Sequence, residues 1–278
     1  METTAQTPVA LIGYGEAGHS FASAAAWRGR AVAFDIDPLR GPVMTADGVR
    51  PCSDMAEALG HAALLLSLVT ADAALDVAQQ AASSLRPGAL FCDMNSVAPG
   101  TKREAADAIA AGGGRYVDVA VLAPVQPALM RVPLLVAGPD AEEAGALLRD
   151  LGFENVRMVG DQVGRASAIK MIRSVMVKGI EALTAEMMIA AEAAGVTDEV
   201  LASLDASERT IPWGARAIYN IERMTTHGLR RAAEMAESAR TLEELGVEPL
   251  MTSGIVKRQR LMAGRASDWR TLNGGDGK

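Results

Sequence analysis

The stretch that decides the fold lies near the start of the chain, where residues 8–20 read PVALIGYGEAGHS. The apolar run Val9–Ile12 leads directly into Gly13-Tyr14-Gly15-Glu16-Ala17-Gly18, which has the form G-x-G-x-x-G and precedes an alanine-rich segment. In a strand, loop and helix of this kind, the first glycine permits the tight turn. The second lets backbone approach a pyrophosphate, and the third lets the helix pack on the strand. We therefore expect residues 13–18 to bind a dinucleotide at the N-terminus of a helix.

Asp35 directly follows the second apolar run, Ala31–Phe34. A carboxylate at the end of that strand can accept hydrogen bonds from the adenosine ribose and would repel a 2′-phosphate. The sequence thus favours NAD, with NADP as the alternative because Arg40 lies nearby. Further contacts to the cofactor are expected from four residues that follow later strands: Leu68, Val69, Thr70 and Asn95.

Short apolar runs alternate with helical segments as far as residue 163. Near-continuous apolar strands are typical of a parallel sheet covered on both faces, and alternation of strand and helix is typical of a doubly wound α/β fold. We therefore predict a Rossmann domain over residues 1–163. The predicted strands are Val9–Ile12, Ala31–Phe34, Ala63–Val69, Ala89–Cys92, Tyr116–Val121 and Pro133–Ala137.

After Gly160 the pattern becomes helical throughout. Residues 165–194 hold no proline and one glycine, which predicts one long, largely apolar helix joining the two domains. An all-α domain for substrate binding and dimerisation is predicted over residues 164–272, followed by a disordered tail, 273–278. Its further helices are expected at Thr197–Leu204, Pro212–Thr225, Arg230–Ala239, Thr241–Leu245 and Pro249–Met262. Capping boxes are expected at Thr101 with Glu104, Asp140 with Glu143 and Thr241 with Glu244.

Composition excludes several other classes of protein. The 278 residues carry 27 basic and 34 acidic side chains, a net charge of −7 that offers no basic face for nucleic acid. No apolar run is long enough to span a membrane, and the first one lacks the basic leader of a signal sequence. Two cysteines favour a reducing compartment, which predicts a cytoplasmic protein. The three histidines show no spacing typical of a metal site, so no metal is expected.

Four segments together resemble the β-hydroxyacid dehydrogenase family, which includes 3-hydroxyisobutyrate and 6-phosphogluconate dehydrogenases. They are the glycine loop, residues 93–99 (DMNSVAP), residues 118–124, and the pattern Gly160-x-x-x-Gly164-x-x-x-x-x-Lys170. The resemblance implies an NAD(P)-dependent oxidoreductase in which Lys170 is catalytic. It also implies a variant C-terminal helical domain and a homodimer.

Chemistry supports the same assignment for Lys170. Oxidation of an alcohol needs a base to take the hydroxyl proton as hydride leaves, and a lysine can do so where burial or positive charge lowers its pKa. A small anionic or polar substrate is expected, a β-hydroxy acid or a related alcohol. The residues expected to bind it are Asn95, Ser96, Ser174, His227 and Arg231.

Two departures from the family leave other functions open. Residues 122–124 (Leu-Ala-Pro) stand where relatives offer backbone N–H groups to a carboxylate, and proline has none. Val177 occupies the place of the general-acid glutamate of the decarboxylating members. The alternatives are therefore an imine reductase on the same fold and a non-catalytic dinucleotide sensor.

Overall fold

The computed structural model describes residues 8–25, 27–207 and 212–265, so the predicted tail at 273–278 lies outside the described residues. The chain divides into two compact units, Met1–Ser174 and Val175–Lys278. The long helix α7, Arg165–Ala194, has the bounds that the sequence predicts; it begins in the first unit and continues into the second.

The first unit is built on one eight-stranded sheet with the order β3-β2-β1-β4-β5-β6-β7-β8. Strands β1 to β6 run parallel, and the order of the strands reverses between β1 and β4. Ligands of such sheets bind at that reversal, outside the carboxyl ends of the strands. The strands are β1 Val9–Ile12, β2 Ala31–Phe34, β3 Arg50–Pro51, β4 Leu64–Ser67, β5 Leu90–Asp93, β6 Arg115–Val121, β7 Leu134–Ala137 and β8 Val156–Gly160.

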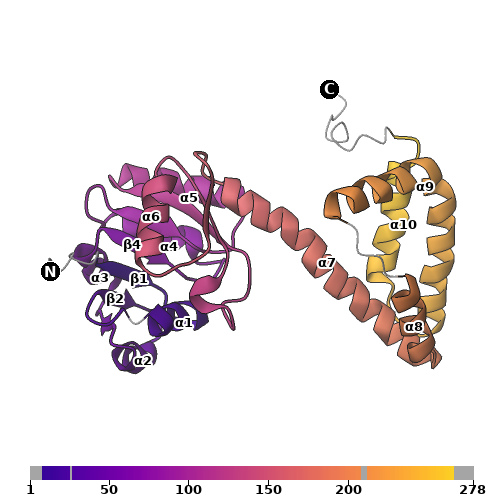
Figure 1. Ribbon diagram of the computed structural model, residues 1–278, viewed down its shortest axis with the longest axis horizontal. Coiled ribbons are helices and arrows are strands. Elements are labelled where there is room, and N and C mark those ends of the chain that lie inside the picture. Colours follow the sequence, from indigo (N-terminus) through magenta and orange to yellow (C-terminus); the bar gives the residue numbers. More distant parts are fainter. Residues whose placement is uncertain (1–7, 26, 208–211, 266–278) are drawn as a thin grey trace. The chain divides into compact units, whose positions relative to one another are not determined.

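Helices cover both faces of this sheet (Figure 1). One core contains residues of α1, α2 and α6, and the other contains residues of α3, α4 and α5. The two cores use alternate residues of β1, β2, β4 and β5, which explains why these strands are almost wholly apolar. The helices of this unit are α1 Glu16–Ala25, α2 Arg40–Ala46, α3 Met55–His61, α4 Ala74–Ala82, α5 Pro99–Ala111, the 3-10 turn η1 Leu129–Arg131 and α6 Ala141–Asp150.

The predicted doubly wound Rossmann sheet is confirmed, with two differences. Strand β7 runs antiparallel to β6, so the sheet is not wholly parallel. Two strands were not predicted, β3 and β8, because the first has two residues and the second contains the charged Arg157 and lies at an incompletely buried edge.

The second unit is helical in all its described residues outside short connections. Besides most of α7 it contains α8 Thr197–Ser207, α9 Trp213–Glu244 and α10 Leu250–Met262. Helix α9 is continuous, so the predicted interruption between the helices Pro212–Thr225 and Arg230–Ala239, within the polar segment 222–231, is wrong. Those polar residues belong to an amphipathic helix whose buried side carries Thr225, Gly228 and Ala232. At Gly228 an added Cβ would lie 2.4 Å from the backbone oxygen of Gln259, so glycine allows α9 and α10 to pack closely.

The predicted capping boxes do not form. Helix α5 begins at Pro99, which places Thr101 inside the helix, and Thr241 lies within α9. Asp140 does precede α6, but its side chain makes no capping bond and instead binds Arg115, as Glu143 does. The ion pairs with Arg115 of β6 thus replace the hydrogen bonds that a capping box would form at the start of α6. Among the described residues, none of the helices is both long and apolar enough to cross a membrane.

Candidate functional site

The three glycines of the loop between β1 and α1 meet three different surroundings. A Cβ on Gly13 would lie 2.5 Å from the backbone oxygen of Leu68, and its φ of +94° also requires glycine. A Cβ on Gly18 would lie 2.7 Å from the backbone oxygen of Gly13, so Gly18 allows α1 to approach the loop. Gly15 has no atom within 4 Å of that position. The second glycine therefore leaves open space at the helix N-terminus, where a phosphate fits.

Two residues predicted to bind the cofactor, Tyr14 in this loop and Asp35 after β2, also form hydrogen bonds within the protein. The Tyr14 ring is buried, and its hydroxyl donates to Asp47 at 2.8 Å; burial and this carboxylate raise the pKa of Tyr14. The Asp35 carboxylate accepts the backbone N–H of Tyr14 at 2.5 Å and that of Asp37 at 2.9 Å. Asp35 thus fixes the glycine loop to the end of β2 while it also lines the groove beside it.

A groove of about 950 Å³ runs along the carboxyl ends of β1, β2 and β4. Its lining includes Gly13, Gly15, Asp35, Ile36 and Thr70. The Ile36 side chain is 90% exposed, which gives the groove an apolar platform beside a carboxylate. The groove suits a dinucleotide better than a small anion. The helix N-terminus with the open space at Gly15 can take the phosphates, and the apolar platform can take the adenosine.

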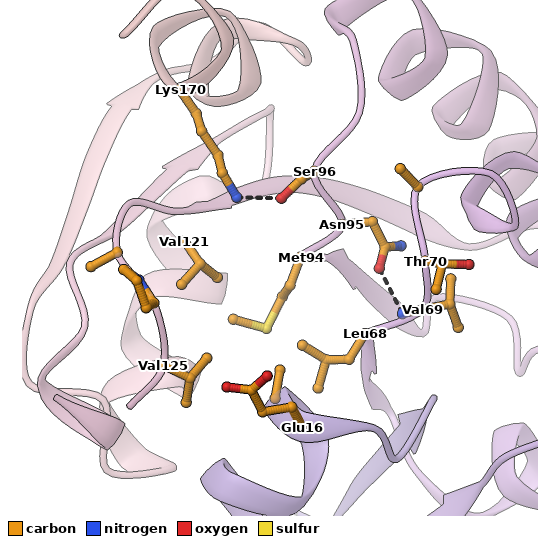
Figure 2. A pocket seen from close by; sticks show the side chains of 14 residues that line it. Glu16, Leu68, Val69, Thr70, Met94, Asn95, Ser96, Val121, Val125 and Lys170 are labelled. Atoms are coloured by element: carbon orange, nitrogen blue, oxygen red, sulfur yellow. Dashed lines mark hydrogen bonds between the residues drawn. The ribbon is translucent and has the colours of Figure 1, made fainter. Parts of the chain in front are cut away.

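A second cavity, of about 510 Å³, adjoins the groove and shares a wall with it: Glu16, Ala17, Leu68, Val69 and Thr70 line both. Figure 2 shows that the Lys170 side chain descends from α7 into this cavity and meets Ser96. The Lys170 ammonium donates a hydrogen bond to the Ser96 hydroxyl. Lys170 and Glu16 are the two charged residues in the lining, and most of the other lining side chains are apolar.

Asn95 lines this second cavity but its amide is largely used by the protein. Its Oδ1 accepts the backbone N–H of Val69 at 2.8 Å, and its Nδ2 donates to the Ser67 hydroxyl at 2.9 Å. Asn95 thereby joins the loop after β5 to the loop after β4. The amide keeps one N–H and one lone pair for a ligand.

Sequence reasoning missed a buried ionic cluster beneath the cavity. Lys102 of α5 is fully buried; its ammonium lies 3.0 Å from Asp93 Oδ1 and 3.5 Å from Asp118 Oδ1. Tyr116 donates its hydroxyl to Asp93 Oδ2 at 2.5 Å, and burial beside that carboxylate raises its pKa. Asp93 directly follows one predicted strand and Asp118 lies inside another, where a charged residue in an apolar run was the available signal. The structure pairs the two residues in the register of β5 and β6.

Three further residues predicted to bind substrate do not line either cavity. Ser174 is half-buried on α7, one turn beyond Lys170. His227 and Arg231 lie on α9 in the second unit, where His227 is exposed and Arg231 is partly buried. Among the described residues there is no group of histidine, cysteine or acidic side chains that could hold a metal ion.

Residues 8–160 match a known family, described as the NAD binding domain of 6-phosphogluconate dehydrogenase. The chain belongs to this family. Residues 191–262 match a second family, described as a domain of unknown function, DUF1932. The dinucleotide groove, the glycine loop and the Rossmann sheet are therefore those of an NAD-binding oxidoreductase family with a C-terminal domain of unassigned role.

Three solved structures illustrate the similarity. A conserved hypothetical protein from Sinorhizobium meliloti 1021 is 40% identical, with 92% of this chain and 88% of that chain covered and a TM-score of 0.63. A conserved protein of unknown function, whose structure is described as similar to 3-hydroxyacid dehydrogenases, is 30% identical over 93% of this chain and 100% of that chain, with a TM-score of 0.61. An imine reductase variant from Myxococcus stipitatus, in complex with NAD+, is 20% identical over 92% and 93% of the two chains, with a TM-score of 0.75. The last of these shows a shared fold only.

Proposed function

We propose that this protein transfers a hydride between the nicotinamide of NAD(P) and the hydroxyl-bearing carbon of a small polar alcohol, a β-hydroxy acid or a related compound. The observation that carries the proposal is the Lys170–Ser96 pair, which lies in the cavity that adjoins the dinucleotide groove. A proton donor and a hydroxyl beside such a groove are what alcohol oxidation and carbonyl reduction require.

The residues of the first unit have separate tasks in this reaction. The N-terminus of α1 and the open space at Gly15 would hold the pyrophosphate, and Asp35 with Ile36 would hold the adenosine. When bound, the nicotinamide supplies or accepts the hydride. Lys170 donates a proton to the carbonyl oxygen in reduction and takes the hydroxyl proton in oxidation, while Ser96 orients both the substrate oxygen and the lysine.

The apolar part of the lining serves to exclude water. Leu68, Met94, Val121 and Val125 surround the space beside Lys170 (Figure 2). In such surroundings the charge on the reacting oxygen is stabilised more strongly by one ammonium than it would be in bulk water.

The test replaces Lys170 with alanine and follows absorbance of NADH with a panel of β-hydroxy acids, aldonates and aryl-substituted hydroxy acids. Loss of the acid–base group should lower kcat by about 100-fold or more, while the Kd for NADH stays near that of the wild type. Lys257→Ala is the matched control, because Lys257 is exposed on α10. If Lys170→Ala turns over like the wild type, or if it loses NADH affinity, Lys170 is not the acid–base group.

A second candidate function is reduction of a C=N bond, and two residues of the cavity lining, Glu16 and Pro124, favour it. The carboxylate of Glu16 faces a mainly apolar space, and Pro124 at the cavity wall has no N–H to offer a substrate carboxylate. A carboxylate in such a place stabilises a cationic iminium group. Turnover of cyclic imines with none of the alcohols would replace the first proposal by this one. NADH binding without turnover of either panel would indicate a sensor.

A further inference from the structure

The buried cluster around Lys102 joins the two elements that carry the reactive pair. We propose that Lys102 is a positioning residue: its ammonium ties the loop bearing Ser96 to the first turn of the helix bearing Lys170. Lys102 itself is fully buried on α5 and touches neither cavity. The expected loss of kcat rests on the proposed function, whereas the expected loosening of the backbone does not.

The first arm of this link is Asp93, the last residue of β5. Its Oδ1 lies 3.0 Å from the Lys102 ammonium and accepts the backbone N–H of Asn95 at 2.9 Å. Lys102 also donates to the backbone oxygen of Asp93 at 2.6 Å. These bonds fix the backbone turn immediately before Ser96.

The second arm is Asp118 of β6, which lies opposite Asp93 in the parallel register. Its Oδ2 accepts the backbone N–H of Gly164 at 3.1 Å and that of Ser167 at 3.0 Å. These N–H groups belong to the start of α7, where helical donors otherwise lack partners and a negative charge is favourable. Lys170 follows Ser167 by about one helical turn, so Asp118 fixes the base of the helix that presents it.

Lys102 is what allows the two arms to lie together. Asp118 Oδ1 is buried and accepts no hydrogen bond, so its stabilisation comes from the Lys102 ammonium at 3.5 Å. A buried ion cluster is a poor way to gain stability, because apolar residues of similar volume often do as well or better. We therefore attribute the charged residue at position 102 to the geometry that the cluster fixes and not to a gain in stability.

The test substitutes Lys102→Met, which keeps the length of the side chain and removes its charge. Hydrogen exchange should become faster at the backbone amides of Asn95, Gly164 and Ser167, and slight misplacement of Lys170 should lower kcat by about 100-fold. The Kd for NADH should rise far less than kcat falls, because the glycine loop and Asp35 lie outside the link, although Asn95, an expected cofactor contact, is part of it. Lys257→Met is the matched control for a lysine-to-methionine change at an exposed site.

A double variant covers the case in which Lys102→Met does not fold. Lys102→Met combined with Asp118→Asn removes one charge of each sign, while the Asn oxygen can still accept an N–H from α7. The link to Asp93 is still broken, so kcat should stay low and Asn95 exchange fast. Wild-type exchange at the three amides in a folded variant overturns the proposal, as does a wild-type kcat. If Lys170→Ala shows that the proposed function is wrong, the exchange rates alone test whether Lys102 positions the two elements.

Discussion

At the scale of single residues, Asp35 illustrates how one side chain serves both the fold and the ligand. Its two carboxylate oxygens accept N–H groups from the glycine loop and from the residues after β2. Each oxygen keeps a lone pair toward the groove that Asp35 lines. The nearby Arg40 forms an ion pair with Asp37 at 3.4 Å, so its charge is partly neutralised. This arrangement favours a ribose hydroxyl over a 2′-phosphate.

The variant Asp35→Asn tests that preference with little change of shape. Removing the negative charge should raise the affinity for NADPH relative to NADH by about tenfold. Both affinities should fall somewhat, because the amide can replace only one of the two accepted bonds, so the informative quantity is the ratio of the two Kd values. Asp107→Asn, at an exposed site on α5, is the control. An unchanged ratio would remove Asp35 from the ribose site.

At the scale of helices, the start of α10 is held by a residue distant in sequence. Pro249 precedes α10 and offers no side-chain cap. Instead the Glu186 carboxylate of α7 accepts the backbone N–H groups of Met251 and Thr252, at 2.7 and 2.9 Å, and the Thr252 hydroxyl at 2.5 Å. Burial by itself favours the protonated form of Glu186, but these hydrogen bonds outweigh it and hold its pKa below the usual range. The second unit thus gains a cap from tertiary structure.

Loss of this cap should destabilise the second unit. Glu186→Ala is expected to lower the free energy of unfolding by about 1–2 kcal/mol, measured by urea denaturation with far-UV circular dichroism. Because the folded pKa of Glu186 is lowered, its contribution is complete above the ordinary pKa of a glutamate and is lost as pH falls through the lowered value. Glu222→Ala, exposed on α9, is the control. A difference between wild type and Glu186→Gln that is independent of pH would contradict the assignment.

The elements also show what a sequence reveals. Strands β1 and β2 were predicted with their observed bounds, because each is a short apolar run: Pro8 and Gly13 flank the first, and Arg30 and Asp35 flank the second. The direction of β7 was not predictable, since an apolar run carries no sign of which way it pairs. The polar residues of α9 were interpreted as a break, although an exposed helix face is equally polar. The local sequence pattern therefore predicted whether a segment is a strand or a helix better than it predicted how strands pair or where a helix is interrupted.

The same limit applies to the site. The glycine loop, Ser96 and Lys170 were identified because each belongs to a motif with a mechanism, and the structure brings the last two into contact. Lys102 was missed because a lysine in a polar helix looks exposed. Only the pairing of β5 with β6 brings Asp93 and Asp118 together and shows that the lysine is buried between them. Residues whose role depends on tertiary pairing leave little trace in a single sequence.

At the scale of the whole molecule, we propose that the long helix packs against a second copy of the chain. Met176, Ile180 and Leu183, spaced as neighbours on one side of α7, are 50%, 47% and 41% exposed. Such a stripe in water is typical of an interface. We expect light scattering at micromolar concentration to give twice the mass of one chain for the wild type. The variant Ile180→Asp should give the mass of a single chain. Leu39→Asp, exposed in the first unit, should leave the dimer intact. A monomeric wild type would show that the stripe serves another purpose.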